Sequence, residues 1–383
     1  MSAKRMIPLL TLAAVVAAAS MGCNKAPLKV AIIGPSGGVL GSFGLALDNG
    51  ALMAIEEWNA KGGVLGRKIV PVVEDSREEP LAAAAAAQTA IYNENAHYII
   101  GDVFSAPSIA ISDVANVAKV IQIAPLSTRA GLTVDSGGAT KTYVFRAGFT
   151  DPAQAKAAAR FAAGKLKATK AVILANTSDA YSEGLAEEFE PAFVKAGGAV
   201  VIKERYSASD TDFTAILGKI KTARADVVYL PDFYTVANTI MRQAKVQGIR
   251  TTFLGSDAWL SAALDLAACE DSYFTEHYWP QDPRAEVKAF NAAYSLEFKG
   301  TLSHEMDSFL LAGGAYDATN LLLQAIRKAG SDDVDKVKVA LEGISFSGVS
   351  GSFTFDAHHD PVKAVSILHV SGGKIACDST ITP

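Results

Sequence analysis

The fold is decided by the segment Gly50-Ala-Leu-Met-Ala-Ile-Glu-Glu-Trp-Asn-Ala-Lys-Gly-Gly-Val-Leu-Gly-Arg-Lys-Ile-Val-Pro-Val-Val-Glu-Asp-Ser76. Apolar residues recur in its first part at three- and four-residue spacing, which predicts a helix over 50–60. Gly62-Gly63 can adopt the left-handed backbone that ends a helix. Residues 68–73 are apolar and β-branched, which predicts a strand. With an apolar strand pattern at 28–33 before it, the segment predicts a β-α-β unit.

The same alternation of strand and helix continues along almost the whole chain. Predicted strands cover 28–33, 68–73, 98–101, 120–123, 143–148, 171–175, 200–205, 227–230 and 251–254, and an extended tail covers 353–370. Predicted helices cover 50–60, 80–93, 106–118, 152–166, 183–196, 212–222, 236–247, 285–298 and 306–329. Strands that alternate with helices indicate parallel sheets covered on both faces. We therefore expect an α/β protein with two doubly wound parallel-sheet lobes.

Bulk composition agrees with this expectation and excludes one class of partner. The chain has 383 residues, of which 50% are hydrophobic, enough for one large or two medium cores. Its formal net charge is −5, so it offers no basic surface for a nucleic acid. We expect no DNA or RNA partner.

The first residues have the features of an export signal. Lys4 and Arg5 precede an apolar stretch over 7–19 that is short for a membrane span. Gly22-Cys23 then indicates a lipoprotein signal, with 1–22 as signal peptide, Cys23 as the lipidated residue and 23–27 as a tether. The alternative is ordinary cleavage after Ala19, with Cys23 incidental. Either processing route places the mature protein in the periplasm or cell envelope.

Several familiar site types are missing from the sequence. Gly34 to Gly41 is glycine-rich but lacks the spacing of a dinucleotide site or a phosphate loop, so we interpret it as a cleft loop. No spacing of cysteine, histidine and carboxylate resembles a metal site, and we interpret the adjacent His358-His359 as solvated or turn residues. The sequence leaves open whether Cys269 and Cys377 form a disulfide.

Five segments resemble those of one known family in the expected order. They are Asn59-Ala-Lys-Gly-Gly-Val-Leu-Gly-Arg-Lys68 with the following strand and Asp75, Tyr181-Ser-Glu-Gly-Leu185, Asp210-Thr-Asp-Phe-Thr214, Arg242-Gln-Ala244, and Phe355-Asp-Ala-His-His-Asp-Pro-Val-Lys363. The chain thus resembles the type I periplasmic binding proteins, specifically the leucine/isoleucine/valine-binding branch, over nearly everything after residue 27.

This resemblance implies an organisation and a function. Lobe I would contain 28–147 plus 283–354, and lobe II would contain 148–282 plus 355–383. Three chain crossings would form the hinge of a Venus-flytrap protein that closes on its ligand. The implied protein is a monomer without a cofactor or enzymatic activity. It would capture an amino acid, with an aliphatic or branched-chain side chain as the favoured class, and deliver it to the permease of an ATP-binding-cassette importer.

Hydroxyl groups at two strand ends of lobe I are candidates for holding a ligand carboxylate. Loops 103–108 and 125–129 each follow a predicted strand, and hydroxyls with helix N–H groups can hold a carboxylate without a lysine or arginine. The resemblance points to Ser105, Ser127 and Thr128 in these loops. The alternative for Ser105 and Ser108 is that they only cap a helix.

The facing candidates lie in lobe II. Asp257 follows a predicted strand, and the resemblance places there the acid that pairs with the ligand ammonium; its alternative is a helix cap. Tyr181 matches a tyrosine that contacts the ligand backbone in the family, although it could be a surface turn residue. Phe233 and Tyr234 match an aromatic pair, and the sequence leaves open which of them faces the ligand.

Apolar side chains near these loops are candidates for the walls of the pocket. They are Phe43, Phe104, Leu126 and Trp259, and ordinary lobe core is the alternative for each. Phe104 is larger than the residue that relatives often carry there, so it is expected to reshape the pocket. The particular amino acid therefore stays open.

Two other functions compete with transport. The same lobes could sense an amide, urea or another small carboxylate on behalf of a separate receptor. A hydrolase on a doubly wound scaffold would need a nucleophile and a base, and the sequence shows no Gly-x-Ser-x-Gly elbow or catalytic histidine pattern. Fold alone does not choose among them.

Overall fold

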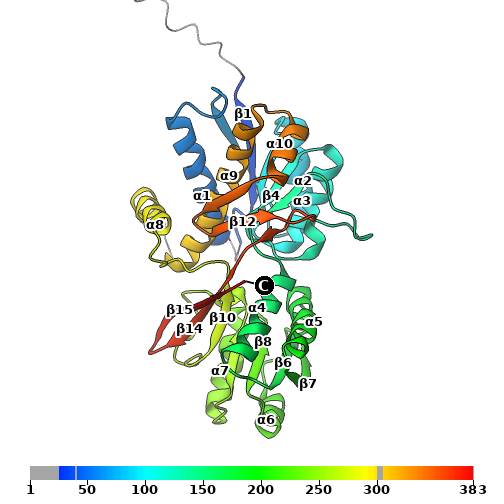
Figure 1. Cartoon of the computed structure of the whole chain (residues 1–383), viewed down its shortest axis with the longest axis vertical. Coiled ribbons are helices and arrows are strands. Elements are labelled where there is room, and N and C mark those ends of the chain that lie inside the picture. The colour runs from blue at the N-terminus through cyan, green and yellow to red at the C-terminus, as the bar shows by residue number, and fades with distance from the viewer. Residues whose placement is uncertain (1–25, 39–40, 300–304, 383) are drawn as a thin grey trace, which may run out of the picture.

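Two large sheets divide the chain into an upper and a lower lobe (Figure 1). The structure is a computed structural model that describes residues 26–38, 41–299 and 305–382. The first sheet has the strand order β2-β1-β3-β4-β5, and the second has the order β15-β14-β10-β9-β8-β6-β7. The expected α/β architecture with two lobes is confirmed.

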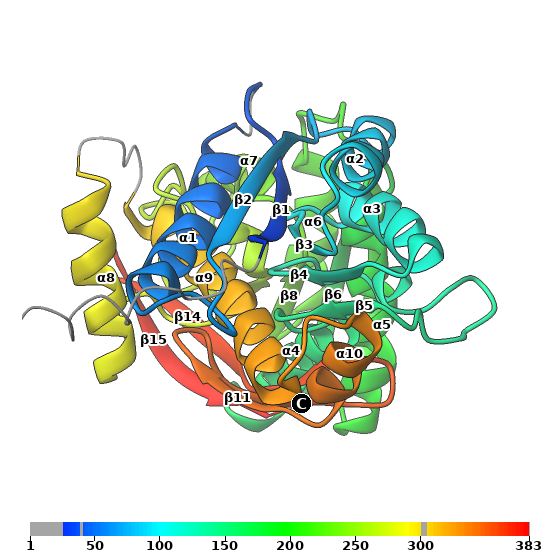
Figure 2. The same ribbon diagram turned by 90° about the horizontal axis from the view of Figure 1, so that it is seen from above.

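The first sheet is parallel throughout and is covered by helices on both faces. Its strands are β1 (Leu28–Gly34), β2 (Ile69–Asp75), β3 (Tyr98–Gly101), β4 (Ile121–Ala124) and β5 (Val144–Arg146). Its helices are α1 (Gly41–Ala60), α2 (Pro80–Gln88), α3 (Ser105–Ala118), α9 (Glu305–Ala329) and α10 (Val334–Glu342). Alternate residues of β1 face opposite sides, so Val30 and Ile32 join the core with α1 and α9, whereas Ala31 and Ile33 join the core with α2 and α3 (Figure 2).

The second sheet is mixed rather than wholly parallel. Its parallel strands are β6 (Lys170–Asn176), β7 (Ala199–Tyr206), β8 (Val227–Leu230), β9 (Thr252–Gly255) and β10 (Tyr273–Glu276). Its helices are α4 (Asp151–Gly164), α5 (Ala180–Lys195), α6 (Thr214–Ala223) and α7 (Tyr234–Val246). The tail adds β14 (Val365–Ser371) and β15 (Lys374–Ile381) as an antiparallel edge. The second sheet is thus parallel from β6 to β10 and antiparallel at the tail, which turns back on itself at Gly372-Gly373.

A third, small sheet spans the expected boundary between lobe I and lobe II at residues 354 and 355. It consists of β11 (Ser345–Gly348), β12 (Gly351–Phe355) and β13 (Pro361–Val362). The expected division between 354 and 355 falls inside β12. Phe355 packs on the first-lobe core, and the ring of His359 stacks on Phe145 at 4.0 Å. The tail therefore enters the second lobe after Val362, and His359 is buried rather than solvated.

Three segments connect the lobes: 147–150 after β5, 277–284 after β10, and 363–364 after β13. Side chains of the first two meet, because the ring of Phe149 stacks on the ring of His277 at 3.8 Å. The second segment leads to α8 (Ala285–Glu297), whose Tyr294 contacts α9 through Phe309. Cys269 is buried, Cys377 is exposed, and both are free thiols.

The segment Gly50–Ser76 forms a helix and a strand as predicted, but the helix begins earlier, at Gly41. Gly50 lies where α1 crosses α9, and a Cβ placed on it would lie 2.1 Å from the carbonyl oxygen of Ala312. This close approach explains a glycine inside a helix, where its backbone freedom is otherwise unfavourable. The pairing of α1 with α9 therefore depends on the absence of a side chain at residue 50.

We predict that Gly50→Ala lowers the free energy of unfolding by about 1–3 kcal/mol, because the added methyl group must push the α9 backbone away. Gly184→Ala is the matched control, since Gly184 lies in α5 and its Cβ would meet nothing within 4 Å. That control should be neutral or stabilising. Chemical denaturation of both variants tests this, and equal stabilities would contradict the close crossing.

Candidate functional site

A cavity of about 370 Å³ lies between the two lobes. Loops at the carboxyl ends of β3 and β4 line it from the first lobe, and loops that follow β6, β8 and β9 line it from the second. Its lining residues are Phe43, Glu78, Val103, Phe104, Ser105, Ala106, Pro107, Leu126, Thr128, Arg129, Asp179, Ala180, Tyr181, Phe233, Tyr234, Asp257, Ala258, Leu260, Glu276, His277, Leu310 and Leu311. This is the crevice that parallel sheets create outside their strand ends.

Asp257 is the acid that the second lobe presents to this cavity. It begins the short 3₁₀ helix Asp257–Trp259, directly after β9. Its carboxylate does not cap that helix; Oδ1 accepts hydrogen bonds from Tyr181 OH and, at 2.8 Å, from Gln154 Nε2. The protein thus holds Asp257 in one orientation, and the bond to Tyr181 joins two residues that the sequence predicted separately.

The surroundings of Asp257 keep it ionised. Burial acts to raise its pKa, but His277, Tyr181 and Gln154 together lower the pKa below its usual value. His277 Nε2 lies 3.3 Å from Asp257 Oδ2. Burial lowers the pKa of His277 as well, so the imidazole stays neutral near neutral pH. The cavity therefore contains a fixed negative charge at Asp257.

The first lobe presents hydrogen-bond donors opposite this acid. Ser105 is the first residue of α3, and the residue before it, Phe104, provides no side-chain cap. Ser105 and Ala106 line the cavity and carry the N–H groups of this first turn, since Pro107 has none. Thr128 lines the cavity, and Ser127 Oγ lies 3.4 Å from Ser105 Oγ. Ser108 is engaged elsewhere, since its hydroxyl donates to the carbonyl of Asp102 at 2.9 Å.

A buried arginine holds the loop that carries Ser127 and Thr128. Arg146, at the end of β5, is fully buried. Its guanidinium donates to the carbonyls of Ser127 at 3.0 Å and Arg129 at 2.8 Å. It also donates to Thr133 Oγ1 at 3.1 Å and forms an ion pair with Asp360 at 2.6 Å. One side chain thus fixes the backbone on both sides of Thr128.

Aromatic and aliphatic side chains form the remaining walls. The rings of Phe43 and Phe104 pack against each other with centroids 5.6 Å apart. Both Phe233 and Tyr234 line the cavity. Trp259 is absent from the lining of the described cavity, because its ring is fully buried beside Gly255 and Phe274. Of the four predicted wall residues, Phe43, Phe104 and Leu126 line the cavity, and Trp259 lies in the core of the second lobe.

Several lining residues were not predicted from the sequence. They are Glu78, Arg129, Leu260, Glu276, His277, Leu310 and Leu311, with Gln154 and Arg146 behind them. Arg129 belongs to a loop that was selected, so its position next to Thr128 was an available signal. Glu276 ends β10 and His277 follows it, and this strand was not predicted from the sequence. Leu310 and Leu311 are indistinguishable from ordinary core residues of a long helix.

The described residues contain neither a metal-binding cluster nor a candidate membrane span. No group of three or more histidine, cysteine or acidic side chains in the described ranges could hold a metal ion. In the same part of the chain, no helix has the length and apolar character to cross a membrane. Cys23 and the expected signal peptide over 1–22 lie outside the described residues.

Comparisons with known proteins agree on one family. The periplasmic binding protein family matches residues 27–374. A leucine-, isoleucine-, valine-, threonine- and alanine-binding protein of Pseudomonas aeruginosa is 29% identical over 360 residues, which cover 93% of each chain. A leucine-binding protein structure from Thermotoga maritima is 32% identical, with a TM-score of 0.79 over 93% of this chain and 99% of its own. An isoleucine complex of a branched-chain amino acid transporter substrate-binding protein from Streptococcus pneumoniae is 28% identical, with a TM-score of 0.79 over 93% and 100%.

Proposed function

Because this chain belongs to the periplasmic binding protein family, we propose that it captures a free amino acid between its lobes and delivers it to an importer in the membrane. The main observation that supports this proposal is the arrangement of charged and polar groups in the cavity. An ionised acid, Asp257, faces the uncapped first turn of α3 across a single apolar-walled cavity. These two poles complement the ammonium and carboxylate of a zwitterion.

The carboxylate is held on the first lobe. Hydroxyls of Ser105, Ser127 and Thr128 and the N–H groups at the start of α3 are its donors, and the positive end of the helix adds to their effect. Arg146 keeps the loop around Thr128 in place, so little loop entropy is lost when the ligand binds. The first lobe is the preformed half of the site.

The ammonium is held on the second lobe. Asp257 supplies the charge, and Tyr181 both orients it and packs against the ligand backbone beside Phe233, whose ring lies 5.7 Å away. Contacts with both lobes stabilise the closed form by the difference in binding free energy between the closed and open forms. The three connecting segments are the hinge for this closure.

The side chain of the ligand enters the apolar part of the cavity. Phe43, Phe104, Leu126, Leu260 and Leu310 form this part, and the relatives named above are binding proteins for aliphatic amino acids. A branched-chain amino acid is therefore the favoured ligand. The partner is the permease of an ATP-binding-cassette importer, and the protein acts as a monomer without catalysing a reaction.

A screen of ligands tests this proposal. The mature chain without its lipidated Cys23, residues 24–383, is heated with single amino acids, short carboxylates, amides, urea and sugars. Ligands that bind the native state raise the unfolding midpoint. We expect aliphatic amino acids to give the largest shifts. If none of the amino acids raises the midpoint, the proposed function is wrong.

One observation favours a second candidate. The carboxylate of Asp257 already accepts hydrogen bonds from Tyr181 and Gln154, so it is stabilised without a ligand ammonium. A sensor for a small carboxylate or amide that feeds a separate receptor would suit this arrangement. The same screen separates the two, because that candidate predicts larger shifts with ligands that lack an amine.

The proposed location is the cell envelope, with Cys23 as the lipid anchor. Cys23→Ser removes the thiol that the lipid would modify, so we expect the full-length variant to move from the membrane fraction to the soluble fraction. Cys377→Ser, at an exposed free thiol, is the control and should fractionate as the wild type does. Continued membrane association of the Cys23 variant would contradict lipidation.

A further inference from the structure

Acidic side chains outnumber cationic ones in the described lining of the cavity. The second lobe contributes the acids Asp179, Asp257 and Glu276. The first lobe contributes Glu78 and one cationic side chain, Arg129. Because the pKa of the buried His277 is lowered and its imidazole stays neutral, Arg129 is the only positive side chain among the described lining residues.

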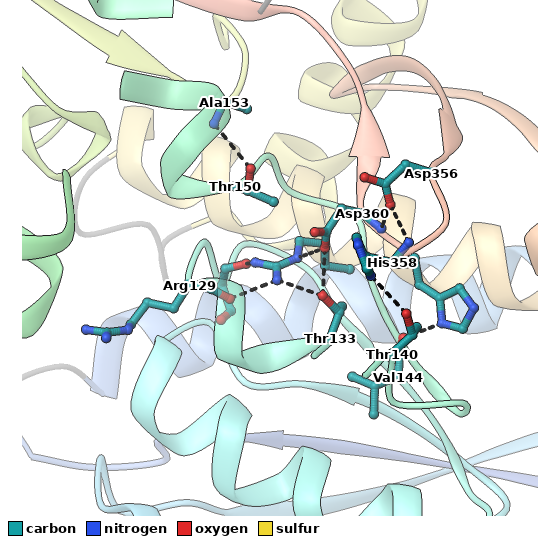
Figure 3. Close-up of polar contacts among 12 residues, drawn as sticks. Arg129, Thr133, Thr140, Val144, Thr150, Ala153, Asp356, His358 and Asp360 are labelled. Carbon is teal, nitrogen blue, oxygen red and sulfur yellow. Dashed lines mark hydrogen bonds and ion pairs between the residues drawn. The ribbon is translucent and has the colours of Figure 1, made fainter. Parts of the chain in front are cut away.

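The backbone of Arg129 is fixed, whereas its side chain is available. Its carbonyl accepts a hydrogen bond from Arg146 at 2.8 Å. Figure 3 shows its side chain extending away from Asp360 and Thr133, which belong to the cluster around Arg146. Its charge acts on the buried carboxyl of Asp151, whose pKa it lowers against the effect of burial. A guanidinium at the wall of a cavity can also bind the carboxylate of a ligand.

The neighbouring helices indicate where that anion lies. Three helices begin at the cavity, α3, α5 and α7. The first turn of α5 is capped, because Asp179 accepts a hydrogen bond from the N–H of Tyr181 at 2.9 Å. The first turns of α3 and α7 have no side-chain cap, and α7 lies on the lobe that carries Asp257. On the first lobe, the first turn of α3 and the guanidinium of Arg129 are thus the positive groups that a ligand carboxylate can meet.

We propose that Arg129 is the counter-charge for the ligand carboxylate and gives this site its selectivity for free acids over amides. This assignment rests on the proposed function and goes beyond the hydroxyl groups that the sequence selected. A guanidinium offers a planar pair of N–H donors that matches a carboxylate, and an amide would leave one of those donors facing another donor.

Calorimetry with L-leucine and L-leucinamide tests the role of Arg129. In Arg129→Gln we expect leucine binding to weaken by about 10- to 100-fold and leucinamide binding to change by less than about threefold, so that acid-over-amide selectivity collapses. Arg129→Lys should keep part of that selectivity because it keeps the charge. Arg77→Gln removes a positive charge outside the described cavity lining and should leave both affinities unchanged.

Three results would contradict the proposal. An equal loss for both ligands in Arg129→Gln would show that Arg129 contributes to closing of the lobes, for example by pairing with Asp179. Unchanged leucine binding would show that it contributes nothing. If the wild-type protein binds neither leucine nor any other amino acid in the thermal screen, both the proposed function and the role of Arg129 are wrong. If only the role of Arg129 is wrong, the wild-type protein still binds leucine.

Discussion

Asp257→Asn is expected to weaken amino-acid binding by a factor of about 30 to several thousand, the range that corresponds to 2–5 kcal/mol for a broken buried charge pair. Asparagine keeps the shape of the side chain and can still accept the hydrogen bonds from Tyr181 and Gln154. It removes only the charge that balances the ligand ammonium. Calorimetry of both proteins with the best amino acid from the screen measures the effect.

Asp179→Asn is the matched control for this experiment. Asp179 also lines the cavity, and asparagine preserves its cap on α5 because both residues are good N-caps. We expect its affinity to stay within about fivefold of wild type, because Asp179 is only half-buried and its charge is screened by solvent. An equal loss in the two variants would indicate that general negative charge, rather than Asp257, attracts the ligand. Unchanged binding in Asp257→Asn would exclude an ammonium at this position.

Arg146→Lys is expected to have the second large effect, on stability and binding together. Lysine can keep the ion pair with Asp360, but a single ammonium cannot also reach both carbonyls that the guanidinium fork holds, at Ser127 and Arg129. Each buried carbonyl left without a partner costs about 1–3 kcal/mol of folding free energy. Because the freed loop carries Thr128, we also expect affinity for the ligand to fall by about tenfold.

Denaturation and calorimetry on the same samples separate the two effects. Arg205→Lys is the control, because Arg205 forms an exposed ion pair with Glu183 at 3.2 Å and should change stability by no more than about 0.5 kcal/mol. Hydrogen exchange in Arg146→Lys should be faster over 127–133 than in the wild type. If stability falls while affinity and local exchange stay unchanged, Arg146 is only a structural residue.

Much of the fold could be predicted from the sequence because its elements have strong local patterns. The strands Tyr98–Gly101 and Val227–Leu230 were predicted at their observed bounds, since each is a short apolar run between helices. Strand β10 was missed because its Tyr-Phe-Thr-Glu sequence is short and ends in an acid that is buried in the fold. Helix α10 was missed because it is only nine residues long and rich in charges.

The site was predicted where it depends on loops at strand ends. Ser105, Tyr181 and Asp257 each follow a predicted strand closely, and the structure brings all three to one cavity. Trp259 was placed differently because nothing local distinguishes an inward-facing aromatic ring from a wall of the cavity. Arg146 looks like any strand residue in the sequence. Its role arises from Asp360, which lies more than 200 positions further along the chain.

The central claim is that the cavity recognises an amino acid by both of its charges. Calorimetric titration of the wild-type mature chain with L-leucine and with 4-methylpentanoate, which has the same carbon skeleton without the amine, tests this claim most directly. The account predicts 1:1 binding of leucine and binding of 4-methylpentanoate that is weaker by at least about 30-fold, the lower limit for loss of a buried charge partner. Equal or tighter binding of 4-methylpentanoate would contradict it.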